Sequence, residues 1–137
     1  MKKIILICQK CDTIYKGDDM KLIVCLDEAG GMAFNNRRQS RDAEVVKRIM
    51  EIAPVLHINS YSQDLFPDAT TGLVEVYFAE VDLPCDAPDE IYIFNWNRLY
   101  PQDFKFSIDL DNYELLSTEE FSGTSHDKIT LCHYRRK

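Results

Sequence analysis

Residues 27–42, DEAGGMAFNNRRQSRD, separate a short apolar run from a segment with helical spacing. The run before them, LIVCL at residues 22–26, is continuously apolar, which is typical of a central strand covered on both faces. Gly30 and Gly31 predict a tight turn after this strand, and the asparagine pair at residues 35–36 predicts a second turn. Residues 32–34, between the two turns, are expected to fold back onto the core.

The segment after this stretch has the pattern of an amphipathic helix. Ser40 is expected to be its N-cap, and Asp42 and Glu44 suit the positive end of a helix dipole. Pro54 is expected to end the helix. One broad apolar face is formed by Val45, Val46, Ile49, Met50, Ile52 and Ala53.

Short apolar and aromatic runs in the rest of the chain predict further strands. We expect these strands at residues 55–59, 73–79, 91–96 and 104–106, with a final antiparallel pair at 113–117 and 129–134. The single helical pattern among them predicts an α/β domain, with a mixed sheet of five to six strands and one main helix.

Composition limits the classes of function. The chain has 137 residues, enough for one domain with a proper core, and a formal net charge of -7. This charge argues against broad nucleic-acid binding, and no apolar run is long enough for a membrane span.

Five cysteines, an odd number, and no signal-peptide pattern predict a cytoplasmic protein. Cys8 and Cys11 form a lone CxxC, which is half of a zinc site at most, so no metal site is expected.

Residues 1–19 differ in character from the rest, and we expect them to be an extra segment that is not native. MKLIV at residues 20–24 has the pattern of a fresh N-terminal strand, and KGDDM at residues 16–20 can be encoded by a purine-rich sequence containing a ribosome-binding site. Residues 20–137 are then the single domain. Mass spectrometry of the native protein tests this start, and peptides from residues 1–19 would contradict it.

Two pieces of the chain resemble the dihydrofolate reductase family. The first is IVCLDEAGGMAFNNRRQSRDAEVV, which is similar to the family's first strand, mobile loop and first helix. The second comprises DEIYIFNWN, FKFSIDLDNYELLSTEE and KITLCHYRRK, which are similar to its closing strands. The resemblance covers more than half of the chain from Met20, and it implies a divergent, shortened relative.

The departures from the family bear on activity. The resemblance implies that Asp42 holds the place of the carboxylate that contacts the pterin ring and assists proton delivery, with Glu44 the second choice. The position of the family's supporting threonine corresponds here to Phe94. The glycine pair that lets the nicotinamide cofactor approach is absent, and residues 59–90 contain no Lys or Arg to grip its 2′-phosphate. Most of the dinucleotide-binding half is therefore expected to be lost, and the cofactor stays unassigned.

Two other chemistries are not supported by the sequence. FNNRRQS and NWNRLYPQDF are similar to a group of short bacterial proteins that carry the name ribonuclease Z. The zinc-dependent ribonuclease needs an HxHxDH cluster, whereas this chain has only His57, His126 and His133. The contiguous Ser125, His126 and Asp127 cannot form a catalytic triad with one another, because neighbouring side chains do not converge in triad geometry.

The candidate ligand site follows from the arginines between the glycine turn and the predicted helix start, where anions are favoured. Two interpretations stay open: the arginines bind an anion, or Arg38 or Arg98 braces the loop by pairing with Asp42 or Asp103. Trp96 and Tyr100 either stack on a ligand or belong to the core. The predicted catalytic residue is Asp42, and the predicted ligand-binding residues are Gly30, Gly31, Asn36, Arg37, Arg38, Gln39, Ser40, Tyr61, Arg98 and Tyr100.

These observations predict a non-reductase ligand-binding or regulatory protein on a dihydrofolate reductase-like scaffold. Its ligand would be a small anionic or nucleotide-like molecule. One alternative is a minimal reductase that acts on a pterin or folate with NADPH and uses Asp42. Another is a protein-interaction domain, for example a homodimer that pairs an exposed edge strand.

Overall fold

A computed structural model describes residues 5–8, 13–16, 21–53, 57–58, 62–66, 76–81, 83 and 87–137. For residues 5–8, 13–16 and 57 it describes the backbone alone. The predicted strand at 55–59 is therefore described only at residues 57–58, and Tyr61 lies outside the described residues.

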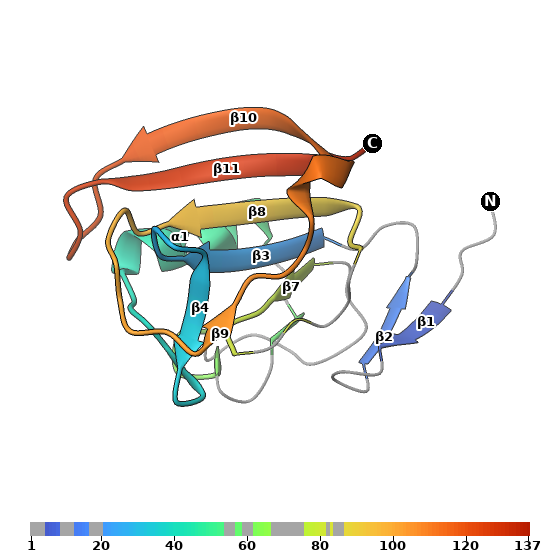
Figure 1. The fold of residues 1–137 in the computed structure, drawn as a ribbon, viewed down its shortest axis with the longest axis horizontal. Coiled ribbons are helices and arrows are strands. Elements are labelled where there is room, and N and C mark those ends of the chain that lie inside the picture. Colours follow the sequence, from blue (N-terminus) through green and yellow to red (C-terminus); the bar gives the residue numbers. More distant parts are fainter. Residues whose placement is uncertain are drawn as a thin grey trace.

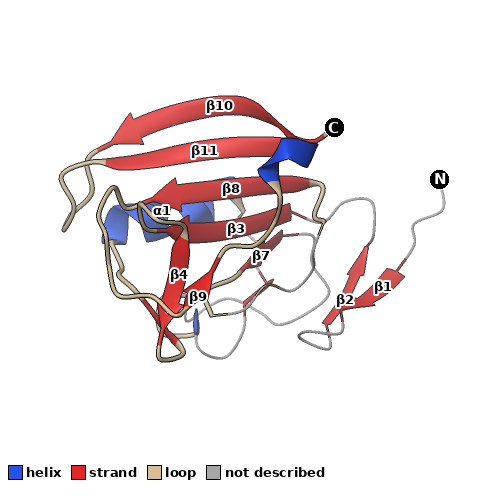
Figure 2. Cartoon of the chain, viewed as in Figure 1, coloured by secondary structure: helices blue, strands red, loops and turns tan. Residues whose placement is uncertain are grey.

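The predicted α/β architecture is confirmed: a six-stranded mixed sheet carries one main helix (Figures 1 and 2). The helix is α1 (Ala43–Ile52). The strands follow one another across the sheet in the order β10 (Tyr113–Phe121), β11 (Ile129–Arg136), β8 (Glu90–Asn95), β3 (Lys21–Leu26), β7 (Val76–Phe78) and β6 (His57–Ile58). The pairs β10–β11 and β11–β8 are antiparallel, whereas β3 is parallel to β8 and β7.

The central position predicted for the apolar run at residues 22–26 is confirmed, because β3 pairs with β8 on one side and with β7 on the other. Alternate residues of β3 point to opposite faces of the sheet. Ile23 packs with Val45 and Ile49 of α1, while Leu22 and Val24 belong to the cluster on the other face. Both faces are therefore covered, which explains the unbroken apolar run.

A small three-stranded sheet covers the face opposite α1 (Figure 1). It comprises β5 (Arg37–Arg38), β4 (Gly31–Phe34) and β9 (Phe104–Lys105), in that order. Met32 of β4 is buried against the large sheet, as expected for a segment that folds back onto the core. Asn35 and Asn36 join β4 to β5 with φ angles of 53° and 58°, so the predicted second turn is a two-residue hairpin turn in the left-handed region.

The C-terminal antiparallel pair is longer than the sequence pattern predicts. A 3-10 turn, η2 (Leu110–Asn112), leads into β10, and β10 pairs with β11 along its length, apart from an irregularity between Leu115 and Ser117. β10 and β6 are the two edges of the large sheet. A separate antiparallel pair is formed by β1 (Ile5–Cys8) and β2 (Thr13–Lys16).

Candidate functional site

Asp42 is the N-cap of α1, where the sequence predicted Ser40. The backbone of Asp42 is extended, with φ −153° and ψ 131°, and its Oδ1 accepts a hydrogen bond from the backbone N–H of Glu44 at 2.9 Å. The prediction for Ser40 was wrong because the helix begins at Ala43, three residues after Ser40. The hydroxyl of Ser40 is engaged instead by His126 and Tyr100.

The loop between β10 and β11 closes over the carboxylate of Asp42. The backbone N–H groups of Thr124 and Ser125 each donate to Asp42 at 2.8 Å, and their hydroxyl groups lie 3.0 and 3.1 Å from it. Burial alone would raise the pKa of Asp42, but these backbone donors, His126 and the N–H of Glu44 together hold the pKa well below its usual range. Asp42 is therefore a buried, ionised acceptor whose two oxygens are occupied by the protein itself.

His126 is buried beside Asp42 and connects it to two hydroxyl groups. Its Nδ1 lies 3.0 Å from Oδ2 of Asp42. Its Nε2 lies 3.0 Å from Oγ of Ser40 and 3.0 Å from the hydroxyl oxygen of Tyr100. The ring is stacked on Trp96, with centroids 4.6 Å apart and planes inclined by 25°, so Trp96 belongs to the core and holds the imidazole in place.

Asp27, a second buried carboxylate, organises the turn that follows β3. Its Oδ1 accepts from the N–H of Ala29 at 2.9 Å and of Gly31 at 2.8 Å, and its Oδ2 accepts from Nε2 of Gln39 at 3.0 Å. Gly30 has a φ of +81°, which explains the glycine at this position. The structure thus places Gly30, Gly31 and Gln39 in the architecture of the turn.

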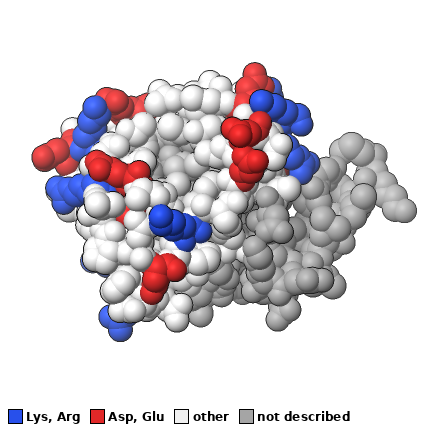
Figure 3. All heavy atoms as spheres, in the orientation of Figure 1, with Lys and Arg blue, Asp and Glu red and all other residues white. Residues whose placement is uncertain are grey.

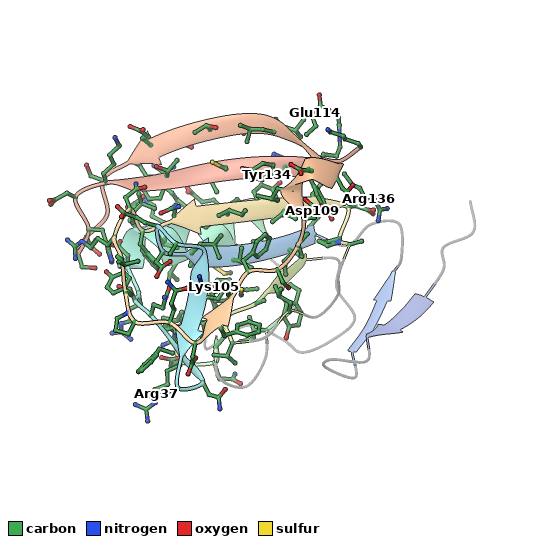
Figure 4. All side chains as sticks on the ribbon, in the orientation of Figure 1. Arg37, Lys105, Asp109, Glu114, Tyr134 and Arg136 are labelled. Carbon is green, nitrogen blue, oxygen red and sulfur yellow. The ribbon has the colours of Figure 1, made fainter. Side chains whose placement is uncertain are left out.

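Arg38 is held by two carboxylates from other parts of the chain. Its guanidinium contacts Glu80 at 2.5 Å and Asp64 at 2.6 Å, and these partners raise its pKa above the usual range. Arg38 therefore pairs with carboxylates and braces the loop, which was one of the two interpretations of the arginines. Its partners are Asp64 and Glu80, where Asp42 or Asp103 was expected. Arg37, by contrast, projects from the tip of the β4–β5 hairpin into solvent (Figure 4).

A surface cavity of about 470 Å³ opens between this hairpin and the segment after β8. It is lined by Phe34, Asn35, Arg37, Arg38, Gln39, Tyr100 and Pro101. Asn36, Arg37 and Arg38 border a neighbouring cavity of about 300 Å³. Arg98 is exposed and does not line either cavity.

Tyr100 lies between the cavity and the hydrogen-bonded side chains of Ser40 and His126. It lines the cavity, and its hydroxyl group contacts both of these residues. The sequence analysis did not single out His126, Thr124 or Ser125 as site residues. Their contribution depends on the closure of the β10–β11 loop over the start of α1. The only local signal was a cluster of polar side chains in that loop.

The described residues also bear on two other kinds of site, a metal centre and a basic surface. Within the ranges that the structure describes, His, Cys, Asp and Glu do not gather in threes in a way that could hold a metal ion. Figure 3 shows Lys and Arg interspersed with Asp and Glu over the described atoms of the face it displays. Among the described helices, none has the length and apolarity to cross a bilayer.

The sheet order and the single main helix define a dihydrofolate reductase-like α/β fold. Among solved structures, dihydrofolate reductase from Enterococcus faecalis, complexed with NADP(H) and RAB-propyl, matches this chain with a TM-score of 0.60. The match covers 90% of this chain and 99% of that chain at 14% sequence identity. This likeness concerns the fold. No family model and no curated protein matches the chain.

Proposed function

We propose that this protein is a non-reductase ligand-binding or regulatory protein that uses a dihydrofolate reductase-like scaffold to bind a small anionic or nucleotide-like molecule. The observation that carries the non-reductase part is the occupation of Asp42. The resemblance assigns this position to pterin binding and proton delivery. Here both carboxylate oxygens accept hydrogen bonds from the protein, and the low pKa opposes protonation at neutral pH.

The sequence supports the same proposal from the cofactor side. Residues 59–90 contain no Lys or Arg, so this segment offers no side-chain cation to the 2′-phosphate of a reduced dinucleotide. The minimal reductase is therefore the weaker alternative.

The cavity beside the β4–β5 hairpin supports the ligand-binding part. Its volume of about 470 Å³ lies in the range of small-molecule sites. Phe34 and Tyr100 offer aromatic surface for a flat ring, and Arg37 offers a charge that would attract an anionic group.

The experiment measures reductase turnover and anion binding separately. With NADPH and dihydrofolate we expect no oxidation above the rate without protein. Turnover that disappears in Asp42→Asn would overturn the non-reductase assignment.

Binding is measured by calorimetry with adenosine monophosphate and with inorganic phosphate. We expect Arg37→Ala to weaken adenosine monophosphate binding by about tenfold or more, because a charge-assisted hydrogen bond is lost. Arg135→Ala is the matched control, since Arg135 lies on β11 and its side chain is 59% exposed. No binding of either probe, or equal losses in the two variants, would contradict the proposed site.

A further inference from the structure

Ser40, His126 and Asp42 form a continuous hydrogen-bonded series that the ligand-binding proposal does not use. Oγ of Ser40 lies 3.0 Å from Nε2 of His126, and Nδ1 of His126 lies 3.0 Å from Oδ2 of Asp42. Hydroxyl, imidazole and carboxylate in this order and at these distances are the arrangement that activates a serine nucleophile. Ser40 and His126 are separated by 86 positions in the sequence, so the fold brings them together.

The direction of each hydrogen bond follows from the state of Asp42. An ionised carboxylate only accepts, so Nδ1 of His126 carries a proton and donates it to Asp42. Nε2 is the ring nitrogen that faces Oγ of Ser40 and the hydroxyl oxygen of Tyr100, each at 3.0 Å. The hydroxyl group of Tyr100 also lies 3.4 Å from Oγ of Ser40, and when it donates there the hydroxyl proton of Ser40 is directed to Nε2.

The base is held in place before any substrate arrives. Trp96 stacks on the imidazole, and the side chain of His126 is 2% exposed. Thr124 and Ser125 fix the carboxylate that orients the ring. Such support around a reacting pair reduces the reorganisation needed during reaction.

The nucleophile, unlike the base, is accessible from the surface. Ser40 is half-buried, its neighbour Gln39 lines the cavity of about 470 Å³, and Tyr100 lines that cavity while contacting Ser40. Ser40 itself does not line the cavity, so a carbonyl group at this wall would reach Oγ of Ser40 past Gln39 and Tyr100, the two lining residues next to it. The phenolic O–H of Tyr100 is the group of this wall that would donate to the oxygen of a tetrahedral intermediate, in exchange for its contacts with Ser40 and His126.

We propose that Ser40, His126 and Asp42 constitute a catalytic triad that hydrolyses small carboxylic esters bound in this cavity. Ser40 is the nucleophile, His126 is the general base, and Asp42 is a positioning residue that acts through His126. The proposal rests on the cavity of the proposed function as the substrate site, and Arg37 at its rim favours esters with an anionic group.

In the first half-reaction, Oγ of Ser40 forms a bond to the ester carbonyl carbon while its proton passes to Nε2 of His126. The carbon–oxygen bond to the alcohol then breaks, and His126 returns the proton to the departing alkoxide. Water attacks the resulting acyl-Ser40, giving its proton to His126. The acyl bond to Oγ breaks, Ser40 recovers its proton, and ester plus water become acid plus alcohol.

The experiment treats the full chain with a fluorophosphonate and locates the label by intact-mass and peptide mass spectrometry. The phosphorus should bond to Oγ of Ser40 with release of fluoride. We expect labelling of the wild-type protein and of Ser117→Ala, a control on the exposed face of β10, but not of Ser40→Ala. In Tyr100→Phe we expect slower labelling, by about tenfold or more, because one donor is lost.

Hydrolysis of p-nitrophenyl acetate is the second readout. Its rate in Ser40→Ala should fall to the rate without protein, while circular dichroism confirms that the variant is folded. No label on the wild-type protein, label shared among several serines, or unchanged hydrolysis in folded Ser40→Ala would overturn the triad.

The outcomes also separate this proposal from the one on which it rests. Labelling of Ser40 together with unchanged adenosine monophosphate binding in Arg37→Ala would support the triad and overturn the anion site. Normal anion binding without label would overturn the triad and support the ligand site.

Discussion

Asp42 shows how one buried charge can hold two distant parts of a chain together. Its oxygens cap α1 and accept hydrogen bonds from the β10–β11 loop, so removing the charge leaves several buried donors without an acceptor. Unsatisfied buried groups of this kind cost more than the net contribution of the hydrogen bonds themselves.

We therefore expect Asp42→Asn to lower the free energy of unfolding by about 3 kcal/mol, measured by urea denaturation at neutral pH. Asp127→Asn, in the same loop but exposed, should change it by less than about 0.5 kcal/mol. Equal stabilities of the two variants would contradict this role for Asp42.

The same residue predicts an acid-sensitive stability. The pKa of Asp42 is lower in the folded protein than in the unfolded chain, so its contribution is complete above the unfolded-state pKa of about 3.9. The contribution is lost as the pH falls from there through the lower folded-state pKa. Urea titrations of the wild-type protein and Asp42→Asn should therefore converge on acidification. A difference that stays constant down to acid pH would count against the assignment.

The β10–β11 loop is the element that assembles the site, and it packs closely on the start of α1. A Cβ added at Gly123 would overlap the carboxylate of Asp42 and would lie 2.8 Å from Cδ1 of Ile129. Neither neighbour has room to move, because Asp42 is held by hydrogen bonds and Ile129 is buried in the core.

We expect Gly123→Ala to cost about 1–3 kcal/mol of unfolding free energy, since the loop must shift away from the helix. It should also slow the labelling of Ser40, because His126 moves with the loop. Ser122→Ala, one residue earlier and exposed, is the control and should leave both properties unchanged. Full stability of Gly123→Ala would show that the loop is not packed as the structure describes.

Across the whole molecule, stability depends on a sheet that is covered on both faces. Ile23 faces α1 and Val24 faces the small sheet, and each is 0% exposed. Leu115, on the edge strand β10, is 51% exposed and serves as an apolar residue outside both clusters.

Chemical denaturation should show that Ile23→Ala lowers the free energy of unfolding by about 2–5 kcal/mol, because it leaves a cavity between β3 and α1. Leu115→Ala should cost less than about 1 kcal/mol. If the two losses are similar, Leu115 is buried in solution, and contact of β10 with a second copy becomes the explanation to test by sedimentation.

Local patterns in the chain were sufficient to predict its main helix and its central strand. The apolar run at residues 22–26 indicated a strand with both faces buried, the spacing of apolar residues after Asp42 indicated one amphipathic helix, and Asn35–Asn36 indicated a turn. Each of these depends on backbone preferences and burial periodicity within a few residues. The family resemblance added the expectation of a dihydrofolate reductase-like fold, and the structural match confirms it.

The chemistry of the site was decided by contacts that such patterns do not contain. Ser125, His126 and Asp127 were not expected to form a triad with one another. His126 contacts Ser125, with 3.1 Å between Nδ1 and Oγ, and it also meets another serine and another aspartate, Ser40 and Asp42, across 86 and 84 positions of sequence. The N-cap is Asp42, where the sequence predicted Ser40, for the same reason. The β10–β11 loop donates hydrogen bonds to Asp42 and places His126 against Ser40. A side chain's partners depend on which segments the packed sheet brings together, and the residues beside it in the sequence do not determine that.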